Sequence, residues 1–134
     1  FYFNEALNTV SIVDGAVADV TLVEDTVNYD STRSAWPGLT QSDKFGAKWS
    51  GGLRITTAGT YTLETRSDDG SVVMVDGAVV VDNDGLHSMK TKTSDIYLAA
   101  GDHTLVIKFF ENGGGAGIIF RYSGPTVSIV DGAV

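Results

Sequence analysis

Two short segments of this chain carry side chains that are suited to holding a metal ion. The first is Arg66-Ser67-Asp68-Asp69-Gly70-Ser71, in which two carboxylates are adjacent. The second, the glycine loop, is Glu111-Asn112-Gly113-Gly114-Gly115-Ala116-Gly117, which an amide side chain enters. A hard cation such as Ca²⁺ takes six to eight oxygen ligands from carboxylates, amide side chains, backbone carbonyls and water. Glycine lets a backbone turn its carbonyls toward an ion. The two segments therefore predict the halves of one calcium site that is open to a ligand.

Strand patterns surround both segments. Residues 60–66 alternate, with Tyr61 and Leu63 on one face, which is the period of a half-buried strand. Asp76-Gly77 is a strong two-residue hairpin signal. The remaining predicted elements are strands at 71–75, 78–81, 94–98, 103–110 and 117–122, a loop at 82–85, and a polar, irregular segment at 24–48. Short strands separated by turns predict an all-β fold, a single-domain antiparallel β-sandwich of jelly-roll type.

Composition sets outer bounds on location and partners. The chain has 134 residues, a net charge of −8 and no cysteine. This length predicts one domain, and the acidic balance argues against a nucleic-acid partner. No apolar run approaches the length of a membrane span. Since disulfides are excluded, a bound metal is one candidate for stapling the loops of an extracellular or cell-surface protein. The chain begins at Phe1, and we expect a mature product or a piece of something longer.

A nonapeptide occurs twice without change. Thr9-Val10-Ser11-Ile12-Val13-Asp14-Gly15-Ala16-Val17 is identical to Thr126-Val127-Ser128-Ile129-Val130-Asp131-Gly132-Ala133-Val134, 117 residues further on. One interpretation is two equivalent strands of low-complexity sequence. The other is tandem repetition, in which the tail begins the next copy or pairs with a neighbouring one. We therefore divide the chain into a sandwich at 1–124 and a linker or strand at 125–134.

Several motifs, in order, resemble the domain family named after the anthrax protective antigen, a β-sandwich module of adhesins, flocculins, toxins and glycosidases. They cover nearly the whole chain. The most specific is Ser67-Asp68-Asp69-Gly70-Ser71 with Val75-Asp76-Gly77. The others are Tyr2-Phe3-Asn4, Phe45-Gly46-Ala47-Lys48-Trp49-Ser50-Gly51, Ala58-Gly59-Thr60-Tyr61-Thr62-Leu63, Leu98-Ala99-Ala100-Gly101-Asp102-His103 and Phe109-Phe110-Glu111-Asn112-Gly113-Gly114.

The resemblance implies a lectin-like site. It implies a cis peptide between Asp68 and Asp69, and Ca²⁺ held by these two carboxylates, the Asn112 amide, and carbonyls near Gly114 and Ala116. Sugar hydroxyls would complete the calcium shell. The ligand-binding set is then Asp68, Asp69, Asn112 and Gly113. The simpler interpretation is that the aspartates cap a turn and the glycine loop is a hairpin tip.

Other side chains with possible chemistry have plainer interpretations. We expect His87 and His103 to be hydrogen-bonded structural residues, and Trp49 to pack in the core. Trp36 either packs or lines the edge of the site. Asp68 and Asp69 are neighbours, whereas hydrolysis of a glycosidic bond needs opposed carboxylates about 5–10 Å apart. The sequence therefore predicts no enzyme and no catalytic residue.

Three functions follow from these expectations. The first is a secreted, calcium-dependent, carbohydrate-binding adhesion module. The second is a structural repeat of an extracellular fibre whose copies join in tandem or head to tail by terminal strand addition. The third is an accessory binding domain of a glycoside hydrolase.

Overall fold

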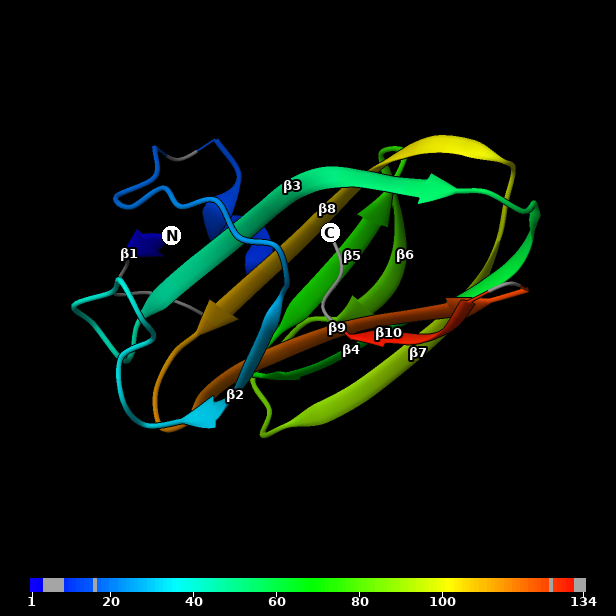
Figure 1. Cartoon of the computed structure of the whole chain (residues 1–134). Helices are drawn as coiled ribbons and strands as arrows, with labels where there is room; N and C mark the ends of the chain where they lie inside the picture. Colours follow the sequence, from blue (N-terminus) through cyan, green and yellow to red (C-terminus); the bar gives the residue numbers. More distant parts are fainter. Residues whose placement is uncertain (4–8, 16, 126, 132–134) are drawn as a thin grey trace.

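The computed structural model describes residues 1–3, 9–15, 17–125 and 127–131, which form two antiparallel sheets packed as a sandwich (Figure 1). The first sheet has the order β1-β3-β8-β5-β6, with bounds Tyr2–Phe3, Phe45–Ile55, Gly101–Glu111, Ser71–Val75 and Ala78–Asn83. The second has the order β10-β9-β4-β7, with bounds Val127–Asp131, Ala116–Gly124, Gly59–Asp68 and Lys90–Leu98. Strand β2, Asn28–Thr32, also pairs with β9. The predicted all-β antiparallel sandwich is confirmed.

Period-two alternation accounts for the core. Tyr61 and Leu63 on β4 are buried, as are Ile107 and Phe109 on β8, because successive residues of a strand point to opposite faces. Strand β8 is longer than the predicted 103–110, and it pairs with β3 in unbroken register from Phe45↔Glu111 to Ile55↔Gly101. Strand β2 and the start of β3 lie in the segment 24–48, which was predicted to be irregular. The two inner faces meet in one apolar cluster between the sheets.

Trp36 belongs to this core and does not line the edge of the site. Its side chain is buried, it stacks on Tyr29 with ring centroids 4.1 Å apart, and it meets Phe45 edge to face at 5.1 Å. Its indole N–H donates to the Ala116 carbonyl oxygen at 3.4 Å. The irregular segment before β3 therefore covers one end of the sandwich with a buried aromatic ring.

The β5–β6 hairpin turns at Asp76-Gly77 as predicted. Both residues have positive φ, 50° and 82°, which is the requirement of a type I′ turn. The predicted loop at 82–85 was placed too early, since β6 continues to Asn83. Asn83 pairs with Ser71 in the ladder, and its side-chain amide donates to the Lys90 carbonyl oxygen at 2.8 Å. These tertiary contacts hold a residue that local sequence favours in a turn.

The two copies of the nonapeptide adopt different structures. Residues Val10–Val13 of the first copy form the 3₁₀ helix η1, whereas Val127–Asp131 of the second form β10 against β9. The interpretation as two equivalent strands is therefore wrong. Asn4 of the opening motif, and Ala16, Thr126 and residues 132–134 of the repeat, lie outside the described residues. Among those described, no helix is long and apolar enough to cross a membrane.

Candidate metal centre

Two connections between the sheets lie side by side at one end of the sandwich. Asp69 and Gly70 join β4 in the second sheet to β5 in the first, and residues 112–115 join β8 in the first to β9 in the second. Because β5 pairs with β8 and β4 pairs with β9, both connections cross at the same end. The strand topology thus places the two segments predicted from sequence next to each other.

Asp69 is held from both sides by backbone donors. Its side chain is 7% exposed; one oxygen accepts the His87 N–H at 3.1 Å, and the other accepts the Asn112 N–H at 2.9 Å. The Phe110 N–H donates to the Gly70 carbonyl oxygen at 3.0 Å, which ties the two connections together. The Asp68–Asp69 peptide is cis, as the resemblance implied. The Asp69 carboxylate is therefore fixed in position and retains further lone pairs for a ligand.

Glu111, the last residue of β8, completes an acidic cluster that sequence reasoning missed. One carboxylate oxygen each from Asp68, Asp69 and Glu111 lies within 4.8 Å of the others. Glu111 is fully buried, and neither of its carboxylate oxygens has a hydrogen-bond donor among the described residues. A signal was present in the sequence: Glu111 is in phase with Leu105, Ile107 and Phe109, which face the core. A charged residue on a buried face is rare unless it is paired or binds a metal.

The charges in the cluster are unbalanced. Burial raises the pKa of Glu111 to about 8, and the carboxylates of Asp69, Asp43 and Asp68 reinforce the shift. Asp43, just before β3, also has a buried oxygen with no hydrogen-bond partner in the described part of the chain. Two ionised carboxylates only accept, so a hydrogen bond between Glu111 and Asp43 needs a proton on one of them. Burial and the neighbouring Asp69 also raise the pKa of Asp68, against an opposing effect of His87.

The glycine loop has a packing role as well as a place beside the aspartates. Gly114 has a φ of +85°, which suits glycine. At Gly115 a Cβ would lie 2.8 Å from the Ser31 hydroxyl oxygen and 3.7 Å from an Asp68 carboxylate oxygen, and at Gly117 it would lie 2.8 Å from the Ser31 Cα. These two glycines therefore let β2 approach β9 closely, a requirement that the sequence did not reveal.

The remaining predicted ligands differ in how they are placed. Asn112 is half-buried and contacts Asp69 through its backbone, while Gly113 and Gly114 are exposed at the apex of the loop. Ala116 is buried, and its carbonyl oxygen accepts the Trp36 indole N–H, which leaves one lone pair for another partner. The structure brings Asp68, Asp69 and Asn112 together.

A third segment, the residues after β6, borders the cluster and was not predicted to do so. His87 donates its backbone N–H to Asp69, and its two ring nitrogens lie 2.8 Å from the Asn83 carbonyl oxygen and 2.9 Å from that of Ser88. His87 is thus a hydrogen-bonded structural residue, as expected, but it lies beside the site. Leu86 next to it is 58% exposed. The backbone of the segment after β6 therefore contributes a hydrogen-bond donor to the site.

The residues present fit a hard cation. All donors in the cluster are oxygens, which Ca²⁺ prefers. Glu111 adds a buried carboxyl group that has no hydrogen-bond donor among the described residues, and a cation would stabilise its ionised form. Nothing in this donor set favours a soft metal, since the chain has no cysteine.

Comparisons with known proteins agree with this architecture. The sequence profile of the PA14 domain family matches residues 6–131. The PA14 sugar-binding domain from an RTX adhesin is 23% identical, with a TM-score of 0.77 over 97% of this chain and 92% of that one. The PA14 domain of the MpAFP antifreeze protein is 21% identical, with a TM-score of 0.79 over 98% of this chain and 87% of that one.

Other similar structures are much longer than this chain. An anti-sigma factor domain-containing protein from Clostridium clariflavum is 19% identical, with a TM-score of 0.76; the match covers 99% of this chain but only 43% of that one. At these identities the structural likenesses show the fold alone. Among curated proteins, none matches the chain. Because the family profile covers nearly all of the sequence, the chain belongs to the PA14 domain family.

Proposed function

We propose that this domain is a calcium-dependent carbohydrate-binding module of an extracellular adhesion protein. Asp68, Asp69 and the Asn112 amide would hold Ca²⁺, with carbonyls near Gly114 and Ala116, and vicinal sugar hydroxyls would replace its remaining waters. The observation that carries the proposal is the cluster of three carboxylates, of which Glu111 is fully buried and has no hydrogen-bond donor in the described part of the chain. Under the cation, Glu111 and Asp43 would supply compensating negative charge.

Further support comes from the exposure of the cluster and from a relative. Asp68 is only half-buried, and Gly113 and Gly114 of the glycine loop are exposed, so a ligand would reach the cation from solvent. The exposed Leu86, adjacent in sequence to His87, would offer an apolar contact for one face of a sugar ring. The RTX adhesin domain of the same family is described as sugar-binding. No step of this proposal requires catalysis, and the domain would act by binding alone.

Calcium binding is tested first by thermal melting. At a Ca²⁺ concentration one hundred times its Kd, binding adds about 2.7 kcal/mol of stability, which raises Tm by roughly 8 °C in a domain of this size. A chelator should remove this increase. The D68N/D69N variant should lose it as well, whereas D95N, which removes an exposed carboxylate on β7, should retain it. An identical Tm with calcium and with chelator would remove calcium from the proposal.

Sugar binding is then tested on a glycan array in calcium buffer. We expect signals that vanish with chelator and with D68N/D69N, and that persist with D95N. Leu86→Ser should weaken sugar binding without changing the calcium-induced increase in Tm, because it removes an exposed apolar side chain that carries no ligand atom. An array without signal, from a protein that binds calcium, would leave a structural metal site and no lectin.

The second candidate function, a structural repeat of a fibre, is favoured by the duplicated nonapeptide. Its C-terminal copy is paired with β9 of its own chain. In this arrangement the copy is not available for simple addition to the sheet edge of a neighbouring molecule. Joining of copies would instead require exchange of a segment. The third candidate, an accessory domain of a larger enzyme, is compatible with the first because the same site would bind the enzyme's substrate.

A further inference from the structure

The first copy of the nonapeptide occupies a defined surface on the first sheet, which we call the η1 cradle: Gly46, Val72, Asp84, Lys108 and Phe110. Val10 packs with Val72 and Phe110, and Ile12 and Met74 lie against this group. A Cβ on Gly46 would lie 2.3 Å from Ile12 Cδ1. Val13 is 1% exposed. The cradle therefore accepts specific apolar side chains of the segment Thr9–Asp14.

Polar contacts fix the register of the segment in the cradle. The Asp84 carboxylate accepts the Val10 N–H at 3.0 Å and the Thr9 hydroxyl at 2.7 Å. At the other end, the Lys108 ammonium group lies 2.6 Å from the Asp14 carboxylate. The cradle thus recognises the sequence Thr-Val-Ser-Ile-Val-Asp through both apolar and polar contacts. The same sequence is present a second time at 126–131.

The second copy has different partners. Backbone pairing with β9 joins Val127 to Gly124, Val130 to Tyr122 and Asp131 to Arg121, with an irregularity between the first two pairs. The hydrogen bonds of a strand ladder join backbone groups, which every residue except proline carries in full. Identical residues therefore have a site on the first sheet that contacts the side chains of the first copy and a backbone-pairing site on the second sheet.

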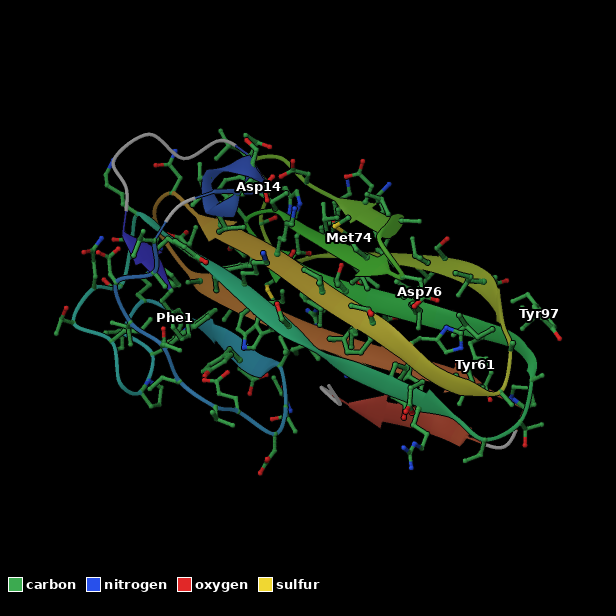
Figure 2. The ribbon with its side chains drawn as sticks, turned by 90° about the horizontal axis from the view of Figure 1, so that it is seen from above. Phe1, Asp14, Tyr61, Met74, Asp76 and Tyr97 are labelled. Atoms are coloured by element: carbon green, nitrogen blue, oxygen red, sulfur yellow. The ribbon has the colours of Figure 1, made fainter. Side chains whose placement is uncertain are left out.

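The second copy cannot reach the cradle of its own chain. Pro125, directly before it, lies against Gly59 at the start of β4, since its Cγ would be 2.6 Å from a Cβ there. Asp84 of the cradle lies against Gly70, just past the other end of β4. The strand between these points, Gly59–Asp68, spans roughly 30 Å at about 3.3 Å per residue. Figures 1 and 2 show η1 and β10 on different sheets and toward opposite ends of the sandwich.

We propose that residues 126–131 of one molecule bind the η1 cradle of a second copy of this chain, in place of that copy's own residues 9–14. The tail leaves one end of the sandwich and the cradle lies at the other, so the contact joins different surfaces and propagates head to tail instead of closing a dimer. In the unmodified chain, residues 9–14 compete with the tail at a high effective concentration because they are covalently attached. The exchange is thus suppressed until the local copy is displaced. This proposal does not depend on the metal site.

The repeat supplies matched variants for the test, because Val13 and Val130 are equivalent positions. V13D places a charge at a site that is 1% exposed and should expel the local segment from the cradle, leaving the tail intact. Sedimentation velocity should show concentration-dependent assembly of V13D well beyond that of the unmodified chain. V13D/V130D, in which both copies are disabled, should sediment as a monomer. Equal sedimentation of V13D and V13D/V130D would overturn the proposal.

A less disruptive variant and a synthetic peptide test the proposal independently, in case V13D does not fold. D14K reverses the exposed pair with Lys108 and should also favour exchange, while D14K/D131K should not. The synthetic nonapeptide TVSIVDGAV should bind V13D or D14K at least about tenfold more tightly than it binds the unmodified chain, and should break up their assemblies. The same peptide with aspartate at its fifth position should do neither. Absence of peptide binding to both variants would also overturn the proposal.

Discussion

Strand β5 has an aspartate–glycine pair at each end, and the two pairs have opposite electrostatic surroundings. At its start, Asp69 is nearly buried beside Asp68 and Glu111, and its carboxylate accepts hydrogen bonds from the backbone N–H groups of His87 and Asn112. At its end, Asp76 is exposed and lies 2.6 Å from His103 Nδ1, and it also accepts the Thr104 N–H (Figure 2). The same dipeptide thus forms a folding turn in one place and a candidate binding site in the other. Neighbouring charges, supplied by strand pairing, make the difference.

The largest expected difference between the two ends of β5 is in how stability depends on pH. Folded Glu111 keeps its proton up to about pH 8, whereas an unperturbed glutamate loses it near 4.5. The folded state therefore binds more protons between these values, and the metal-free protein should lose stability as pH rises through this window. The loss is at most about 5 kcal/mol.

E111Q should remove that loss, since glutamine carries no proton to release. Urea unfolding in chelator from pH 4.5 to 8.5 measures it, and the curves of E111Q and the unmodified chain should diverge with rising pH. E64Q, which alters a glutamate paired with Arg121 outside the cluster, is the matched control. Parallel curves for E111Q and the unmodified chain would show that loss of the Glu111 proton does not cause the decrease in stability.

The two glycines offer a second contrast. At Gly70 a Cβ would lie 2.4 Å from the Phe110 ring and 2.7 Å from the Gly85 backbone nitrogen, so G70A should cost about 3 kcal/mol of unfolding free energy. Gly77 has open space around it but a φ of +82°, so G77A should cost only about 1 kcal/mol. Chemical denaturation of the two variants compares the values. Equal costs would mean that the site loop is no more tightly packed than the hairpin turn.

The smallest expected effect is at Asp76. The Ala99 carbonyl and the Asp76 carboxylate both raise the pKa of His103 by accepting hydrogen bonds from its ring. D76N should lower that pKa, observed by NMR titration of the ring protons. D102N should lower it less, because Asp102 acts only through its more distant charge. The stabilisation from His103 is present at low pH and lost as pH rises through its folded pKa. A larger effect of D102N than of D76N would contradict this ranking.

Much of the fold follows from local patterns. The alternation at 60–66 and the Asp76-Gly77 signal predicted β4 and the β5–β6 hairpin because strand period and turn dihedrals are properties of a few adjacent residues. The ends of the strands were harder to predict from local sequence. Asn83 continues β6 because its amide bonds Lys90 on β7, a partner that no local window contains.

The candidate site was half predictable for the same reason. Asp68, Asp69 and Asn112 stand out by residue type, and the resemblance to a known family placed them together. Glu111 was missed as a member of the cluster, although its phase on β8 indicated burial. Its proximity to Asp68 and Asp69 arises only from the pairing of β5 with β8 and of β4 with β9.

The sequence by itself determined the six strands from β4 to β9, the tight hairpin, the paired carboxylates and the presence of two identical nonapeptides. Tertiary structure alone decided that one nonapeptide is the helix η1 and the other the strand β10, because their residues are the same and only their surroundings differ. It also decided that carboxylate oxygens of Asp68, Asp69 and Glu111 lie within 4.8 Å of one another, with Asp43 acting on Glu111 as well. Local propensity acts over a few adjacent residues, whereas burial and charge proximity depend on which distant strands pair.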